Sequence, residues 1–128
     1  MPTQADVVYA SKLYIKVWKY HFAYLTPGAD PTFGVIHGSE LQYVNGVVAP
    51  GHPGETANQA KLMNVYWSSF IVFGDPNKVN SSAPTWPQYA IKNETQMRFS
   101  NGTAYTEPDN IRRNATDFWR SIPDVLMH

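Results

Sequence analysis

The run from Lys16 to Leu25 constrains the fold more than any other part of this sequence. Aromatic residues stand at every second position of the run: Trp18, Tyr20, Phe22 and Tyr24. A period of two, with β-forming residues throughout, predicts a β-strand over Lys16–Leu25. Because a strand has unpaired N–H and C=O groups along both edges, this one requires neighbouring strands. We interpret His21, which lies on the strand, as a packed or partly exposed strand residue and not as a catalytic group.

A loop at Thr26–Pro31 follows, and then the segment GVIHGSELQYVNG places His37 beside a glycine. Ser39 and Gln42 have the spacing of a capping box, which predicts a helix over Gly38–Asn45. An imidazole at a helix start can take a proton from a nucleophile and return it to a leaving group, because its pKa lies near neutral pH. On these residues alone, a loop histidine without chemistry is the alternative.

A second capping-box spacing, at Thr56 and Gln59, predicts a longer helix that ends near Phe73. Apolar residues recur along this helix at helical spacing, so we expect one face to be buried. These residues are Ala60, Met63, Trp67, Phe70 and Ile71. Gly74 and the proline two residues later end the helix. We interpret Asp75, between them, as a turn residue and not as a catalytic acid.

The last third of the chain predicts one more strand and one more helix. The strand is Gln96–Ser100, and Trp86–Tyr89 is expected to pack as an extended segment. Glu107-Pro108 is expected to open the last helix, since proline fits its first turn, and Pro123 is expected to end it. The apolar face of this helix comprises Ile111, Ala115, Phe118 and Ile122. Together these elements predict an α/β fold over residues 1–128, with no internal domain boundary.

The composition argues against several classes of function. Ten basic and ten acidic residues cancel without forming a basic stripe, so we expect neither nucleic acid nor an anionic membrane as a partner. There is no cysteine, which excludes a disulfide and a thiolate nucleophile. The four histidines lack metal-binding spacings, so we expect no metal and no cofactor. No apolar run approaches the roughly 20 residues of a transmembrane helix.

Four N-x-S/T sequons occur, where roughly one would be expected by chance. Their asparagines are Asn80, Asn93, Asn101 and Asn114. This excess indicates a glycosylated, secreted protein. The N-terminal residues show no basic cap followed by an uninterrupted apolar segment, so they do not predict a signal peptide. The two observations agree if the chain is the later part of a longer extracellular protein.

The segment GVIHGSELQYV resembles the catalytic-histidine segment of the type B carboxylesterases, the family of cholinesterases, fungal lipases and related esterases. Further matches follow in the order in which the family has them. They are Tyr20 and Phe22, then Trp67 and Phe70, Gly74-Asp75-Pro76-Asn77, Trp86-Pro87 with Tyr89, and Phe118-Trp119. The resemblance covers nearly the whole chain but only about the C-terminal quarter of a family member. It implies a C-terminal fragment of an α/β-hydrolase fold, with one or two strands of an incomplete sheet and packed helices.

The resemblance also implies hydrolysis of a small carboxylic ester through an acyl-enzyme, with His37 as the catalytic histidine. Glu40 matches a family position that supports the histidine loop; a carboxylate that stabilises its own helix is the alternative. No G-x-S-x-G nucleophile motif or glycine-rich oxyanion loop occurs, and Asp6 and Asp30 stand in no matching motif. We therefore expect the chain alone to be inactive. A non-catalytic cholinesterase-like interaction domain and a truncated product without function are the alternatives.

Overall fold

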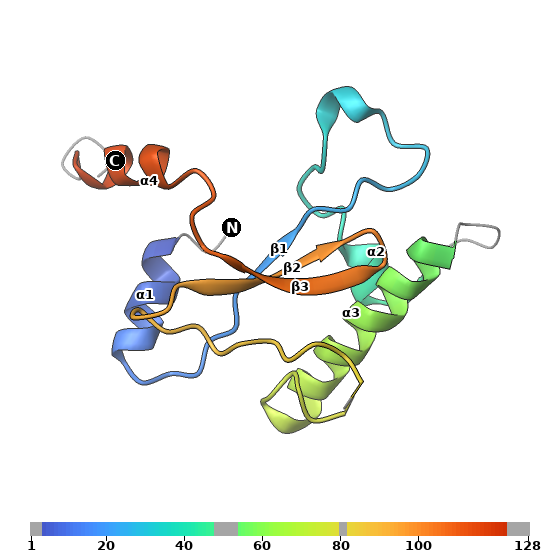
Figure 1. Ribbon diagram of the computed structural model, residues 1–128, viewed down its shortest axis with the longest axis horizontal. Helices are drawn as coiled ribbons and strands as arrows, with labels where there is room; N and C mark the ends of the chain where they lie inside the picture. The colour runs from blue at the N-terminus through green and yellow to red at the C-terminus, as the bar shows by residue number, and fades with distance from the viewer. Residues whose placement is uncertain (1–3, 48–53, 80–81, 123–128) are drawn as a thin grey trace.

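A small open sheet of three strands lies in the middle of the computed structural model, with helices beside it (Figure 1). The structure describes residues 4–47, 54–79 and 82–122. The strands are β1 (Tyr20–Phe22), β2 (Thr95–Ser100) and β3 (Thr103–Pro108), in the order β1-β2-β3. The helices are α1 (Gln4–Lys12), the 3-10 helix η1 (Pro31–Phe33), α2 (Leu41–Val44), α3 (Gly54–Phe73) and α4 (Arg113–Arg120). β1 is parallel to β2 and β3 is antiparallel to it, so the sheet is mixed.

β1 confirms the strand that the aromatic alternation predicts, but it is shorter than expected. The backbone approaches it in an extended conformation, and the Lys19 carbonyl accepts a hydrogen bond from the Met97 N–H at 3.0 Å. The pairing with β2 ends at Phe22, whose partner is Phe99, and the Ala23 N–H still bonds to the Phe99 carbonyl at 2.8 Å. Phe22 is buried and its neighbour His21 is only partly buried, as the alternation predicts. Along its other edge, β1 pairs with no strand among the described residues.

β2 is the late strand that the sequence predicts, whereas β3 was not expected. Asn101 and Gly102 join the two strands, with φ angles of 51° and 74°. Two successive residues in this left-handed region suit a two-residue β-hairpin, and an Asn-Gly pair is the sequence signal for it. The helix start expected at Glu107-Pro108 was wrong, because these residues end β3 and α4 begins at Arg113. Pro108 is tolerated there because it ends the outer strand of the sheet.

The capping box expected at Thr56 and Gln59 was also wrong. α3 begins at Gly54, so both residues lie inside the helix, where they are buried. The Thr56 hydroxyl shares a hydrogen bond of 2.6 Å with the Tyr24 hydroxyl. Gln59 Oε1 accepts a hydrogen bond from the Gly102 N–H at 3.1 Å. These polar groups therefore join α3 to the end of β1 and to the β2–β3 turn instead of capping a helix.

Aromatic rings dominate the core between α3 and the sheet. The buried core residues are Phe22, Tyr24, Tyr43, Ala60, Met63, Tyr66, Trp86, Met97, Phe99 and Ala104, and Trp67 packs against them. Most ring pairs meet edge to face, for example Tyr66 and Trp86 with centroids 5.5 Å apart. This geometry suits the charge distribution of aromatic rings. Three of the five residues expected on the apolar face of α3, namely Ala60, Met63 and Trp67, therefore face the core as predicted.

The other two residues expected on that face, Phe70 and Ile71, are 47% and 78% exposed, so their predicted burial was wrong. With Val72 and Phe73, which are also exposed, they form what we call the α3 patch. The last turns of α3 are covered only in part: Ser69 is buried and donates to the Asp75 carbonyl, and Trp18 meets the Phe70 ring at 5.7 Å. The α3 patch is a large apolar surface for one helix end.

The turn after α3 forms as the sequence predicts. Gly74 has a φ of 65°, and its N–H bonds to the Phe70 carbonyl at 2.8 Å. Asp75 Oδ1 accepts a hydrogen bond from the Asn77 N–H at 2.9 Å, so Asp75 is a turn residue. The Asn77 side chain in turn bonds to both the N–H and the carbonyl of Trp86, at 2.7 and 3.0 Å. The turn thereby positions the extended segment that carries the buried Trp86.

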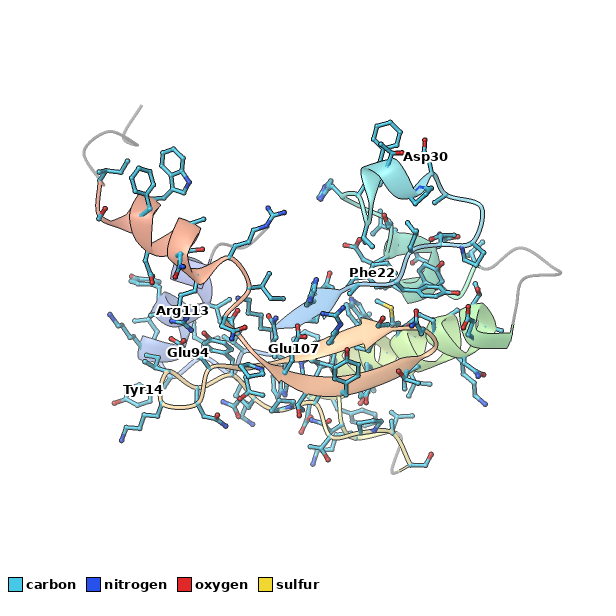
Figure 2. All side chains as sticks on the ribbon, turned by 45° about the horizontal axis from the view of Figure 1, so that its top comes forward. Tyr14, Phe22, Asp30, Glu94, Glu107 and Arg113 are labelled. Carbon is cyan, nitrogen blue, oxygen red and sulfur yellow. The ribbon has the colours of Figure 1, made fainter. Side chains whose placement is uncertain are left out.

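α4 lies at the end of the molecule opposite α3 (Figure 1). An ion pair between Arg113 and Glu94 holds its first residue beside the chain that enters β2 (Figure 2). The apolar face expected on this helix is not covered, since Ile111 and Phe118 are 42% and 58% exposed. Pro123, expected to end the helix, lies outside the described residues. In the described part of the chain, no helix combines the length and apolarity needed to cross a bilayer.

Candidate active site

His37 lies in a turn between η1 and α2, and the loop before it is ordered by Asp30. The Asp30 carboxylate accepts a hydrogen bond from the Thr32 N–H at 2.8 Å at the start of η1. This backbone hydrogen bond holds the pKa of Asp30 below its ordinary value. Gly34 then takes a φ of 61°, a left-handed conformation that glycine adopts without steric strain. Asp30 therefore shapes the loop that presents His37.

The capping box expected at Ser39 and Gln42 was wrong, and so was the length of the helix after His37. Residues 37–40 form a turn, and α2 is a single helical turn. The Ser39 hydroxyl donates back to the Ile36 carbonyl at 2.6 Å, and Gln42 Nε2 donates to the Thr26 hydroxyl at 3.3 Å. Serine side chains compete in this way with helix formation, because they can bond to nearby backbone instead. The turn gains an internal bond, and α2 starts without a side-chain cap.

The His37 side chain is exposed and lines a cleft of about 590 Å³. The histidine turn forms one wall of the cleft, together with Val35 and Ile36. The opposite wall consists of residues 17–22, and two α1 side chains complete the lining. An imidazole at the side of a largely apolar cleft can reach a reactant there and exchange a proton with it. The residue with the predicted catalytic role is therefore accessible.

Glu40, the last residue of the turn, is in contact with the sheet. The Tyr20 hydroxyl on β1 donates a hydrogen bond to Glu40 Oε1 at 3.3 Å. Burial, and to a lesser extent the charge and hydrogen bond of Glu40, raise the pKa of Tyr20 to about 12. The phenol is consequently protonated at neutral pH and can act only as a donor to the carboxylate. The sequence offered no sign of this partnership, because the two residues are separated by a loop.

A second histidine, His21, lines the same cleft and is paired with an acid that the sequence did not identify. His21 Nδ1 lies 2.9 Å from Glu107 Oε1. Gln96 and Arg98 also donate to the Glu107 carboxylate, at 2.9 and 3.3 Å. Burial acts to raise the pKa of Glu107, but the hydrogen bonds from these three side chains outweigh it and lower the pKa. His21 is thus held within the sheet, in keeping with its interpretation as a strand residue.

The predicted sequons are accessible wherever the structure describes them. Asn93, Asn101 and Asn114 are exposed, and Asn101 stands in the turn between β2 and β3. Asn80 lies outside the described residues. Among the residues described, no group of three histidine, aspartate or glutamate side chains is placed to hold a metal ion.

Comparisons with known proteins agree with this fold. A profile of the Carboxylesterase family matches residues 2–119. Bile salt-activated lipase of Mus musculus is 29% identical over 120 residues, which cover 87% of this chain and 20% of the lipase. Acetylcholinesterase of Bungarus fasciatus is 26% identical over 117 residues, covering 87% of this chain and 19% of the relative.

A solved structure gives the same result in three dimensions. The crystal structure of a carboxylesterase from Geobacillus stearothermophilus superposes with a TM-score of 0.69 at 26% identity, covering 87% of this chain and 24% of that one. The chain spans about a fifth of the length of the curated relatives it matches. The three strands and the flanking helices thus correspond to one part of a larger fold. The chain belongs to the carboxylesterase family, and its elements form part of an α/β-hydrolase fold.

Proposed function

We propose that residues 1–128 are the C-terminal part of a serine-type carboxylesterase and that His37 is its catalytic histidine. The observation that carries this proposal is the position of His37, exposed on a cleft, within a segment of the carboxylesterase family. The nucleophilic serine, the catalytic acid and the oxyanion donors would come from the remainder of such a protein. The substrate class is a small carboxylic ester, as the names of related lipases and esterases suggest.

In this proposal His37 carries one proton through each half of the reaction. Its imidazole takes the hydroxyl proton as the serine oxygen attacks the ester carbonyl, and then protonates the alcohol that leaves. In the second half it takes a proton from water, which attacks the acyl-enzyme, and returns that proton to the serine as the carboxylic acid departs. An exposed imidazole can accept the proton and return it in both transfers.

We also propose that the protein acts outside the cell and carries N-linked glycans. Four sequons support this, and the three within the described residues have exposed asparagines. An attached glycan requires a surface asparagine in a secreted chain.

A second candidate function is a non-catalytic interaction domain that keeps the fold. The α3 patch favours it, since exposed apolar side chains gathered at one helix end are typical of a docking site. The two candidates differ at one position outside this sequence, the residue at the centre of the G-x-S-x-G motif. A serine there supports the esterase, and a residue that cannot act as a nucleophile supports the interaction domain.

Replacing His37 tests the proposal directly. In the whole protein that carries this segment, His37→Ala should lower kcat by roughly three to six orders of magnitude, because the serine loses its base. His21→Ala is the matched control, since His21 lines the same cleft but is bonded to Glu107; its kcat should stay within about tenfold of wild type. Hydrolysis of a short-chain nitrophenyl ester measures both.

Equal losses in the two variants would contradict the assignment of His37. The 128-residue chain by itself should show no turnover above background, because it contains no nucleophile motif and no oxyanion loop. If the 128-residue chain alone hydrolysed the ester and lost this activity in the His37→Ala variant, the proposal that the serine, the acid and the oxyanion donors come from the rest of the protein would be refuted.

A further inference from the structure

We propose that Tyr20 is a positioning residue for the esterase reaction, whose hydroxyl holds the His37 turn in place through Glu40. This inference rests on the proposed catalytic role of His37. It is carried by the hydrogen bond of 3.3 Å from the Tyr20 hydroxyl to Glu40 Oε1. Tyr20 lies on β1, and Glu40 is three residues after the histidine. The bond therefore spans the cleft between the sheet and the turn.

Tyr20 is itself firmly placed. Its ring meets the rings of Trp67, Trp86 and Phe99 edge to face, with centroids 5.0, 6.1 and 6.2 Å away. The carbonyl of the preceding Lys19 accepts two hydrogen bonds, from the Met97 N–H and from Trp86 Nε1, both at 3.0 Å. A tyrosine side chain has only two soft torsions, so a packed ring leaves its hydroxyl with little freedom. The donor end of the contact is thus preorganised.

The His37 turn behaves as one unit, so an anchor on Glu40 acts on the histidine as well. The Ser39 N–H and hydroxyl both bond to the Ile36 carbonyl, at 3.2 and 2.6 Å. The Leu41 N–H bonds to the Gly38 carbonyl at 3.1 Å. His37 lies inside this bonded backbone, while its own side chain is exposed.

The helix that follows the turn is anchored separately. The Tyr43 ring on α2 packs against Phe22 and Tyr24, with centroids 5.3 and 5.6 Å away. Asn64 Nδ2 also donates to the Val44 carbonyl at 3.0 Å. These contacts all lie after Glu40 in the sequence, so the bond between Tyr20 and Glu40 adds a contact at the histidine end of the unit. Holding a catalytic group in one orientation contributes to catalysis because it removes conformational freedom before the reaction.

Hydrogen exchange followed by mass spectrometry at micromolar concentration tests the anchor in the 128-residue chain. Tyr20→Phe keeps the ring and removes the hydroxyl, so exchange in residues 36–41 should become about tenfold faster. Tyr24→Phe is the matched control, because the Tyr24 hydroxyl bonds to Thr56 and Glu55 on α3 instead; exchange in residues 36–41 should be unchanged. Glu40→Ala, which removes the acceptor, should reproduce the effect of Tyr20→Phe, and the double variant should add nothing.

Equal exchange in the Tyr20→Phe and Tyr24→Phe chains would overturn the proposal, as would additive effects of the two Tyr20 and Glu40 changes. Glu40→Ala alters a partly exposed side chain and keeps the test valid if Tyr20→Phe unfolds the chain.

Activity of the whole protein separates positioning from packing. Tyr20→Phe and Glu40→Ala should each lower kcat by about ten- to a hundredfold with KM unchanged, because the histidine is misplaced and not removed. Tyr24→Phe should change kcat less than about threefold. A change in KM alone, or no change in kcat, would overturn the catalytic part of the proposal. Faster exchange in a protein without any esterase activity would refute the proposed function but leave the anchor standing.

Discussion

The carboxylate of Glu107 is the residue-scale feature that joins all three strands by side chains. His21 on β1 bonds to it, and so do Gln96 and Arg98 on β2. Figure 2 labels Glu107, the second-last residue of the outer strand β3. A carboxylate that accepts several hydrogen bonds has its charged form favoured, which is the cause of its lowered pKa. The stability of the sheet should therefore depend on pH through this residue.

The sign of that dependence follows from the direction of the shift. Because the pKa of Glu107 is lower in the folded chain than in the unfolded one, its contribution is present above the unfolded pKa and is lost as pH falls through the folded pKa. Urea unfolding followed by tryptophan fluorescence should show the wild-type midpoint falling between about pH 6 and about pH 3. Glu107→Gln should be less stable at the higher pH and less sensitive to acidification. A variant that loses stability as steeply as wild type would contradict this account.

At the scale of elements, the hairpin of β2 and β3 depends on a close approach to α3. A Cβ built on Gly102 would lie 2.6 Å from the Glu55 carbonyl oxygen, and the residue has a φ of 74°. Glycine meets both requirements, since it has no Cβ and tolerates a positive φ. The hairpin turn can therefore lie directly on the first turn of α3.

Gly102→Ala should consequently destabilise the chain by about 2–4 kcal/mol, from the clash and the left-handed backbone together. Gly28→Ala is the control, because Gly28 has a φ of 87° but no atom within 4 Å of the added Cβ. It should lower stability by only about 1–2 kcal/mol. Urea midpoints of the two variants measure the difference. Equal losses would show that the hairpin and α3 can separate at little cost.

Sequence patterns predicted those elements that their own residues determine. The alternation at Lys16–Leu25 located β1, and Gly74 located the end of α3. Both capping-box predictions failed because the two hydroxyls bond elsewhere: Ser39 bonds to the Ile36 carbonyl, and Thr56 bonds to the hydroxyl of Tyr24, two residues after β1. The Asn-Gly hairpin was available in the sequence and was overlooked.

In the candidate site, too, local sequence predicted a residue but not its distant contacts. His37 was identified from its flanking sequence, whereas the contact between Tyr20 and Glu40 depends on how a loop folds back over a strand. The pair of His21 and Glu107 likewise requires the order of the strands, which no local pattern of residues specifies.

At the scale of the whole molecule, the α3 patch and the edge of β1 that pairs with no described strand lie on a chain that matches only part of a larger fold. Unpaired strand edges and contiguous apolar surface both favour association. The 128-residue chain should therefore bind a hydrophobic dye, self-associate as its concentration rises and unfold with weak cooperativity. Light scattering and dye fluorescence measure this.

Replacing Ile71 by lysine and Val72 by glutamate should reduce both dye binding and association, because it breaks the α3 patch with charge. A monomeric, dye-silent wild-type chain with one sharp unfolding transition would show that these residues form a self-sufficient domain.

The parallel pairing of β1 with β2 also determines when the molecule can form during synthesis. Tyr20 is paired with Met97, a partner 77 positions later (97 − 20). At 5–20 residues per second, a ribosome takes roughly 4–15 s to supply that partner. Through this interval the aromatic face of β1 lacks β2, and α3 is itself incomplete until Phe73 has been added. Contacts so distant in sequence also close slowly. The segment that carries His37 thus leaves the ribosome well before the sheet that orients it, so the proposed catalytic geometry must be among the last features of this chain to form.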